Sequence, residues 1–279
     1  MRISHCQFET LCGEFEHNLR RVEEGLARAE KERAEIVSFP ECFLTGYPDA
    51  EKEARKGAFT ADSPEVMRVL DLTSRFDPTL IVGFNELRGA DLYNTALVAH
   101  RGHLLGTYSK CAAYQRFHKQ GRTFPVFERN GVKFGVIICA DGGYIEPARI
   151  LALKGARIIF APHWNAIGEK GLLAHFMKVR SDHTARAIEN SVWFVRGNNV
   201  VLDPAKSGIS GDAGIGYGDS YIMDPGGEIM VRSRLHVEDF IMADVDAGRG
   251  PDMSFGLSKS AWSYREFGKF LEEAAKPAG

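Results

Sequence analysis

The stretch that decides the fold is Phe134-Gly135-Val136-Ile137-Ile138-Cys139-Ala140-Asp141-Gly142-Gly143. An unbroken apolar run that is bounded by Lys133 and by small residues is typical of a strand buried on both faces, as in a parallel sheet. Cys139 then stands at the carboxyl end of a central strand, where open α/β sheets bind their ligands. The glycine pair allows a sharp turn, and a helix is expected to begin near Glu146.

Cys139 has two interpretations at this position. Backbone N–H groups at a strand-to-helix turn stabilise a thiolate and can hold an oxyanion, which favours a nucleophile. Free cysteine is also among the most buried residue types, and a small apolar core residue would fit equally well. The position of Cys139 alone leaves both interpretations open.

Two further strand ends carry ionisable side chains. Glu41 follows the largely apolar run over residues 36–40 and precedes a turn-rich segment, and Lys110 follows an expected strand over residues 104–108. A carboxylate at the end of a hydrophobic strand is costly unless it is paired or faces a cleft. Glutamate, lysine and cysteine together can serve as general base, oxyanion-stabilising cation and nucleophile. The three strand ends therefore favour the catalytic interpretation of Cys139.

With these residues in place, the chain resembles the nitrilase superfamily, the carbon–nitrogen hydrolases that use a Glu-Lys-Cys constellation. The blocks that carry the resemblance are Pro40-Glu41-Cys42-Phe43-Leu44-Thr45-Gly46-Tyr47, Tyr108-Ser109-Lys110, Cys139-Ala140-Asp141, Ala161-Pro162-His163-Trp164 and residues 186–190 and 218–227. The blocks follow the order of the family and cover nearly the whole chain. An ordered set of this kind is specific, whereas one block by itself would be weak.

The resemblance implies a fold and an activity. The fold is the α/β class, as a four-layer αββα sandwich, and we expect one domain over residues 1–279. Strands that alternate with helices along the chain favour the same layered class. Glu41 is implied as general base, Lys110 as oxyanion stabiliser and Cys139 as the nucleophile that forms a thioester acyl-enzyme. The expected reaction is hydrolysis of a non-peptide C–N bond in a small amide or an N-carbamoyl compound.

One departure from the family pattern keeps alternatives open. Many members carry a second glutamate between the lysine and cysteine blocks, but residues 111–127 contain no acidic residue, and the equivalent position falls near Gln115. Gln115 can accept a hydrogen bond but cannot neutralise Lys110. The chain could therefore be a non-catalytic or weakly active binding or regulatory member of the same fold. A nitrilase proper is a further alternative, although such enzymes usually have tryptophan where this chain has Ala140.

The candidate substrate-binding residues surround these blocks. The loop over residues 115–119 is basic, which hints at an acidic or phenol-like group on the substrate, although a solvated loop explains it equally well. Arg116, His118 or Lys119 could hold the carboxylate of an N-carbamoyl amino acid. The candidates are Tyr47, Gln115, His118, Ala140, His163 and Trp164, and for each aromatic residue simple packing is the alternative.

Composition bounds the partners and the compartment. The 279 residues carry 35 basic and 37 acidic side chains, and the net charge of −2 gives no footprint for nucleic acid or an anionic membrane. No segment reads as a membrane span or a signal peptide. The five cysteines include no C-x-x-C pair, so we expect a reducing cytoplasm.

The expected partners are a small-molecule substrate and a second copy of the chain. The one metal-like pair, His100-x-x-His103, has no cysteine or carboxylate nearby, so no metal and no cofactor are expected. The resemblance implies a homodimer or a higher homo-oligomer that forms through helices near residues 146–154 and 171–189.

Overall fold

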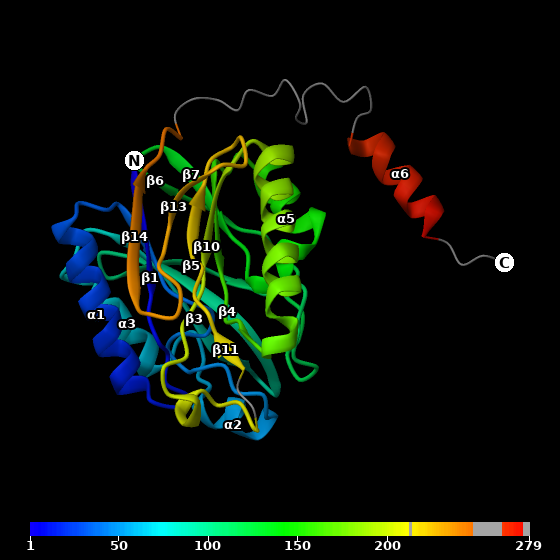
Figure 1. Ribbon diagram of the computed structural model, residues 1–279. Helices are drawn as coiled ribbons and strands as arrows, with labels where there is room; N and C mark the ends of the chain where they lie inside the picture. Colours follow the sequence, from blue (N-terminus) through cyan, green and yellow to red (C-terminus); the bar gives the residue numbers. More distant parts are fainter. Residues whose placement is uncertain (212–213, 248–263, 276–279) are drawn as a thin grey trace.

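The computed structural model describes residues 1–211, 214–247 and 264–275. Two six-stranded sheets lie face to face, and helices cover the outer face of each sheet, which gives the four layers of an αββα sandwich (Figure 1). The expected fold class is therefore confirmed. That residues 1–279 form a single domain stays a prediction, because residues 248–263 lie outside the described residues.

The first sheet has the strand order β14-β1-β2-β3-β4-β5. Strands β1, β2 and β3 run parallel, and β3, β4 and β5 continue as an antiparallel meander. Gly89, with a φ of 60°, closes the β3–β4 hairpin at the turn that the sequence predicts. The bounds are β1 Arg2–Gln7, β2 Ile36–Ser38, β3 Thr79–Arg88, β4 Asp91–His100, β5 His103–Ser109 and β14 Asp239–Asp244.

The second sheet has the order β13-β12-β10-β8-β7-β6. The bounds are β6 Val126–Arg129, β7 Val132–Val136, β8 Ile158–Pro162, β10 Trp193–Gly197, β12 Tyr221–Met223 and β13 Ile229–Arg232. Strand β7 pairs parallel with β8, as the apolar run predicts, and antiparallel with β6. It ends two residues earlier than expected, and the chain then turns into a 3₁₀ helix, η1 Cys139–Gly143. A small ladder joins β9 Ala166–Ile167 to β11 Ile215–Gly216.

The helices are α1 Phe15–Lys31, α2 Glu51–Gly57, α3 Pro64–Ser74, α4 Ile145–Leu153, α5 Leu172–Asn190 and α6 Tyr264–Ala274, with short 3₁₀ turns η2 Glu169–Gly171 and η3 Pro204–Lys206. Helices α1 and α3 cover the outer face of the first sheet, and α4 and α5 cover that of the second (Figure 1). The apolar face of α1 packs on the first sheet through Val22 and Leu26. On the second sheet, α4 and α5 pack through Leu151 and Ala187. None of the helices in the described part of the chain is long and apolar enough to cross a membrane.

The core between the two sheets explains the unbroken apolar runs. Ile36 and Ile81 point into the sheet–sheet interface, while Val37 and Leu80 point toward the helices. Because successive side chains of a strand alternate between its faces, a strand buried on both faces must be apolar at every position. Each fully buried aliphatic side chain contributes about 1.5–3 kcal/mol. The sheet–sheet core brings the strand ends of both sheets to one edge.

Candidate active site

Glu41 lies three residues beyond β2, and its carboxylate is fully buried. Its Oε1 accepts hydrogen bonds from Lys110 Nζ and from Asn94 Nδ2, each at 2.6 Å. Its Oε2 accepts from the backbone N–H of Trp164 at 2.9 Å. A buried charge is tolerated only when it is paired and hydrogen-bonded, and these three donors meet that need.

Lys110 directly follows β5 and is 1% exposed. Burial acts to lower the pKa of Lys110, but the carboxylate of Glu41, with a smaller contribution from Cys139, raises the pKa of Lys110 well above its usual value. Lys110 is therefore a fixed cation between Glu41 and the ring of Tyr47, whose centroid is 5.8 Å from Nζ.

Cys139 opens the 3₁₀ helix η1 with a φ of 46°, a left-handed conformation that side chains other than glycine rarely adopt. Burial, and next the Glu41 carboxylate, raise the pKa of the Cys139 thiol to about 12, against the opposing effects of Lys110 and Asn165. This pKa favours a protonated thiol in the resting site, beside a carboxylate that can accept its proton. That the turn after Cys139 stabilises a thiolate during the reaction stays a prediction.

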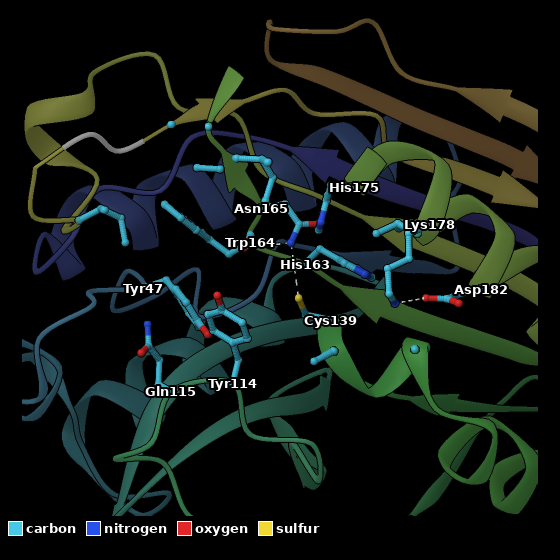
Figure 2. A pocket seen from close by; sticks show the side chains of 18 of the residues that line it. Tyr47, Tyr114, Gln115, Cys139, His163, Trp164, Asn165, His175, Lys178 and Asp182 are labelled. Atoms are coloured by element: carbon cyan, nitrogen blue, oxygen red, sulfur yellow. Dashed lines mark hydrogen bonds and ion pairs between the residues drawn. The ribbon is translucent and has the colours of Figure 1, made fainter. Parts of the chain in front are cut away.

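A cavity of about 690 Å³ holds Cys139 at its wall (Figure 2). Five of the predicted substrate-binding residues line it: Tyr47, Gln115, Ala140, His163 and Trp164. The rings of Tyr47 and Trp164 stack with their centroids 5.6 Å apart. His163 Nδ1 donates to the carbonyl of Ala161 at 2.7 Å, and burial holds the pKa of His163 well below its usual value, so the ring is neutral.

His118 lies outside this cavity. Its Nε2 is 2.9 Å from Asn85 Oδ1, and burial, with Lys110, lowers the pKa of His118 to about 4. Together with Arg116 and Lys119 it lines a second hollow of about 510 Å³, which meets the first at Gln115. The basic loop therefore does not present its charges to Cys139.

The model for carbon-nitrogen hydrolases matches residues 2–251. The chain belongs to this family. The resemblance to the nitrilase superfamily is thereby confirmed, and the expected sandwich recurs in a mutant of the Nesterenkonia AN1 amidase from that superfamily. That structure has a TM-score of 0.74 and 22% identity, with 91% of this chain and 92% of that chain covered.

Curated relatives of this carbon–nitrogen hydrolase have several names. The chain is 28% identical over 261 residues to the glutamine-dependent NAD(+) synthetase of Thermotoga maritima, where the match covers 88% of this chain and 42% of the synthetase. It therefore spans less than half the length of that relative. A nitrilase of Pyrococcus abyssi is 26% identical, with 88% of this chain and 90% of the nitrilase covered.

Some residues of this hydrolase's site have no clear sequence signal. Asn94 holds Glu41 from the middle of β4, and Asn165 Nδ2 lies 3.6 Å from Cys139 Sγ. Asn165 directly follows the block Ala161-Pro162-His163-Trp164, which is the one hint the sequence offers. At the far end of the cavity Lys178 pairs with Asp182 at 2.7 Å. Among the residues that the structure describes, no group of three His, Cys, Asp or Glu side chains is placed to hold a metal ion.

Proposed function

We propose that this carbon–nitrogen hydrolase cleaves the C–N bond of small uncharged amides through a thioester on Cys139. The observation that carries the proposal is the buried contact of Glu41 with Lys110 beside the Cys139 thiol, at the wall of a cavity large enough for a small substrate. Base, cation and nucleophile lie together there, as acyl transfer requires.

In the acylation step, Glu41 takes the proton of the Cys139 thiol as the sulfur attacks the amide carbon. The C–S bond forms, and the negative charge moves to the amide oxygen, where Lys110 and the backbone N–H of Ala140 stabilise it. When the C–N bond breaks, the proton on Glu41 passes to the leaving nitrogen. Ammonia or an amine departs, and Glu41 is again a carboxylate.

In the deacylation step, the Glu41 carboxylate takes a proton from a water molecule that attacks the thioester carbon. The C–S bond breaks, the carboxylic acid product leaves, and the proton on Glu41 returns to the Cys139 sulfur. Glu41 is suited to both steps because Asn94 and the backbone N–H of Trp164 hold both of its oxygens in place. The site thus ends the cycle in its starting protonation state.

The charges in the cavity favour an uncharged substrate. Lys178 is paired with Asp182, and Asp49 accepts from Ser210, whereas Arg116 and Lys119 line the second hollow instead. Within the described residues, the cavity therefore offers no unpaired cation to a carboxylate, which argues against N-carbamoyl amino acids. Mutants of the Nesterenkonia amidase have been captured with butyramide and with the acetamide moiety of fluoroacetamide on the active-site cysteine, and butyramide and fluoroacetamide are both small uncharged amides.

The presence of Gln115 instead of a second glutamate does not deprive the site of the groups that the proposed reaction needs. Glu41 contacts Lys110 at 2.6 Å and supplies the negative charge that a buried ammonium needs. A site kept only for binding has no use for a buried acid beside a thiol, so turnover is favoured over the non-catalytic alternative. Ala140 after the nucleophile, rather than tryptophan, favours amides over nitriles.

Intact-mass spectrometry tests the proposal. The protein is incubated with uncharged aliphatic and aromatic amides, N-carbamoyl amino acids and nitriles, while ammonia release is followed in parallel. We expect an acyl adduct on Cys139 and ammonia release with uncharged amides, and neither with the Cys139→Ala variant. No adduct and no ammonia across the panel would favour the non-catalytic alternative.

We also propose that the chain forms a homodimer through α4 and α5 and acts in the cytoplasm. Large apolar side chains stand exposed along these helices and the turn before them: Tyr144, Ile145, Leu153, Leu173, Met177 and Ile188. A large apolar surface that is exposed on a single chain usually becomes buried when the chain binds a partner or a second copy of itself. All five cysteines are free, which suits a reducing compartment.

A further inference from the structure

Asn165 lies beside the Cys139 sulfur in a fixed orientation. Its Oδ1 accepts a hydrogen bond from Arg196 Nη2 at 2.9 Å, and its Nδ2 lies 3.6 Å from Cys139 Sγ. A guanidinium group can only donate, so the amide oxygen must face Arg196 and the NH₂ group must face the sulfur. The hydrogen bond from Arg196 therefore fixes the orientation of the Asn165 amide.

The backbone of Asn165 is held as firmly as its side chain. Its N–H donates to Asn198 Oδ1 and to Asn199 Oδ1, each at 3.0 Å. Both asparagines follow β10, so the second sheet fixes Asn165 on two sides. The side chain therefore cannot turn away from Cys139 without breaking buried hydrogen bonds.

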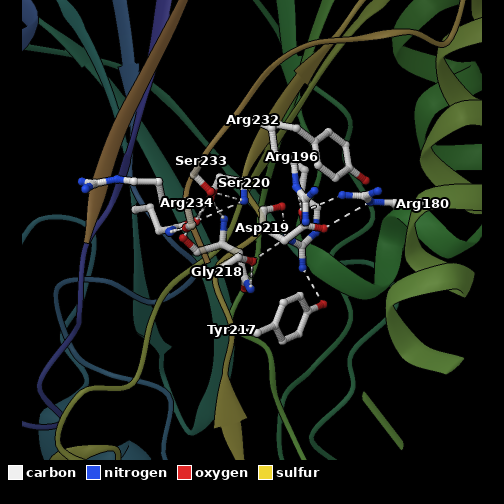
Figure 3. Close-up of polar contacts among 12 residues, drawn as sticks. Arg180, Arg196, Tyr217, Gly218, Asp219, Ser220, Arg232, Ser233 and Arg234 are labelled. Atoms are coloured by element: carbon white, nitrogen blue, oxygen red, sulfur yellow. Dashed lines mark hydrogen bonds and ion pairs between the residues drawn. The ribbon is translucent and has the colours of Figure 1, made fainter. Parts of the chain in front are cut away.

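Arg196 is fully buried on β10, and its contacts are with uncharged oxygens (Figure 3). Nη1 donates to the carbonyls of Gly218 and Asp219, and Nη2 donates to Asn165 Oδ1 and to Tyr217 Oη. The carboxylate of Asp219 turns instead to Arg180 and Arg232. A buried cation that is not neutralised by a carboxylate polarises the groups that accept its hydrogen bonds.

We propose that Asn165 is a further catalytic residue, whose amide N–H stabilises negative charge on the Cys139 sulfur, and that Arg196 is the positioning residue that orients and polarises this amide. The sulfur then lies between an acceptor and a donor, since Glu41 takes its proton while Asn165 donates to it. The inference rests on the proposed function only in taking Cys139 as the nucleophile, and it adds two residues to the reaction.

A purely structural role for Asn165 predicts a different outcome. If Asn165 served only to satisfy Arg196, its loss would weaken folding and leave the reactivity of the Cys139 thiol unchanged. If it stabilises the thiolate, its loss must lower the thiolate fraction at a fixed pH. The reactivity of Cys139 toward a small alkylating reagent reports this fraction directly.

The experiment measures the rate at which iodoacetamide alkylates Cys139 at a fixed pH near 8, in the full chain without substrate, by peptide mass spectrometry. For Asn165→Ala we expect alkylation to be about tenfold slower, as for the loss of one hydrogen bond to a charged group. A smaller side chain would by itself admit the reagent faster, so access cannot imitate this result. An Asn165→Ala rate equal to that of the wild type would overturn the proposal.

Arg196 is tested with a matched control. Arg196→Gln should slow alkylation several-fold, whereas Arg180→Gln removes an arginine from the same cluster without touching Asn165 and should leave the rate unchanged. Equal slowing by both variants would assign the effect to the charge of the whole cluster and overturn the role of Arg196. If Arg196→Gln does not fold, Asn165→Asp keeps the size of the side chain, and it must slow alkylation at least as much as Asn165→Ala.

The two proposals can fail separately. Slower alkylation in the Asn165 variants together with no turnover of any amide by the wild type would keep the Asn165–Arg196 arrangement and reject the hydrolase. Turnover by the wild type together with unchanged alkylation in the variants would reject only the arrangement.

Discussion

Cys139 is held in a left-handed conformation at the first residue of η1, with a φ of 46°. Such a conformation costs a residue with a Cβ atom about 1 kcal/mol, because Cβ approaches the following carbonyl oxygen. The strained residue is the one whose sulfur projects from the turn into the cavity. We therefore infer that the backbone strain results from the way in which the nucleophile is placed.

The strain can be measured with two inactive variants. Cys139→Ala and Cys139→Gly both remove the thiol, so neither should turn over an amide. Glycine tolerates the positive φ, so we expect Cys139→Gly to be about 1 kcal/mol more stable toward urea than Cys139→Ala. A less stable glycine variant would show that the conformation costs little.

Glu41 and Lys110 form an ion pair whose side chains are 0% and 1% exposed. Removing one partner leaves the other as an unpaired buried charge. We therefore expect Glu41→Gln to lower the free energy of unfolding by about 3 kcal/mol and to abolish turnover. The double variant Glu41→Gln with Lys110→Met removes both charges and should regain much of that stability without regaining activity. Urea denaturation of the three proteins measures the effect, and a single variant as stable as the wild type would contradict it.

Some residues of the site can be predicted from sequence because of where strands end. Glu41, Lys110 and Cys139 each follow an expected strand, and the packing of two sheets brings such strand ends together. His118 shows the limit, since its loop carries it to Asn85, away from the cavity, and local sequence does not encode this direction. Asn94 lies 53 positions from Glu41 in the chain, so only the tertiary fold discloses their contact.

At the scale of elements, helix α5 leaves two large apolar side chains exposed on one of its faces. Leu173 and Met177, one turn apart, are 73% and 58% exposed. The sequence predicts the helix to within one residue at each end. It cannot say which part of the apolar surface packs on the sheet and which part faces outward.

The proposed role of the exposed face of α5 in dimer formation can be tested by introducing a charge there. We expect Leu173→Asp to convert a dimer into a monomer, which light scattering coupled to size-exclusion chromatography detects. Met67→Asp is the matched control, because Met67 is 59% exposed on α3 and should leave the assembly unchanged. Dimers of Leu173→Asp as stable as those of the wild type would place the interface elsewhere.

At the scale of the whole molecule, buried histidines set the response to acid. Burial lowers the pKa of His118 to about 4 and of His5 to about 3, so the unfolded chain takes up protons first as the pH falls. Stability should be level above the ordinary histidine pKa near 6.5 and should fall below it, by about 1.4 kcal/mol per pH unit for each such histidine.

The histidine effect can be isolated at one residue. His118→Gln should reduce the slope of unfolding free energy against pH by about 1.4 kcal/mol per unit between pH 6 and 4.5. His103→Gln, at an exposed position, should leave the slope as it is. Equal slopes in the wild type and in His118→Gln would mean that His118 does not contribute.

The two sheets contribute different parts of the site, since Glu41 and Lys110 follow strands of the first sheet and Cys139 and Trp164 follow strands of the second. Neither half of the chain holds a working set of groups. A chain divided at the exposed Arg122, in the connection between β5 and β6, should therefore yield two silent fragments whose mixture recovers activity. The rate of turnover in the mixture would then measure how much of the two fragments has reassembled, so docking of the two sheets could be followed by activity alone.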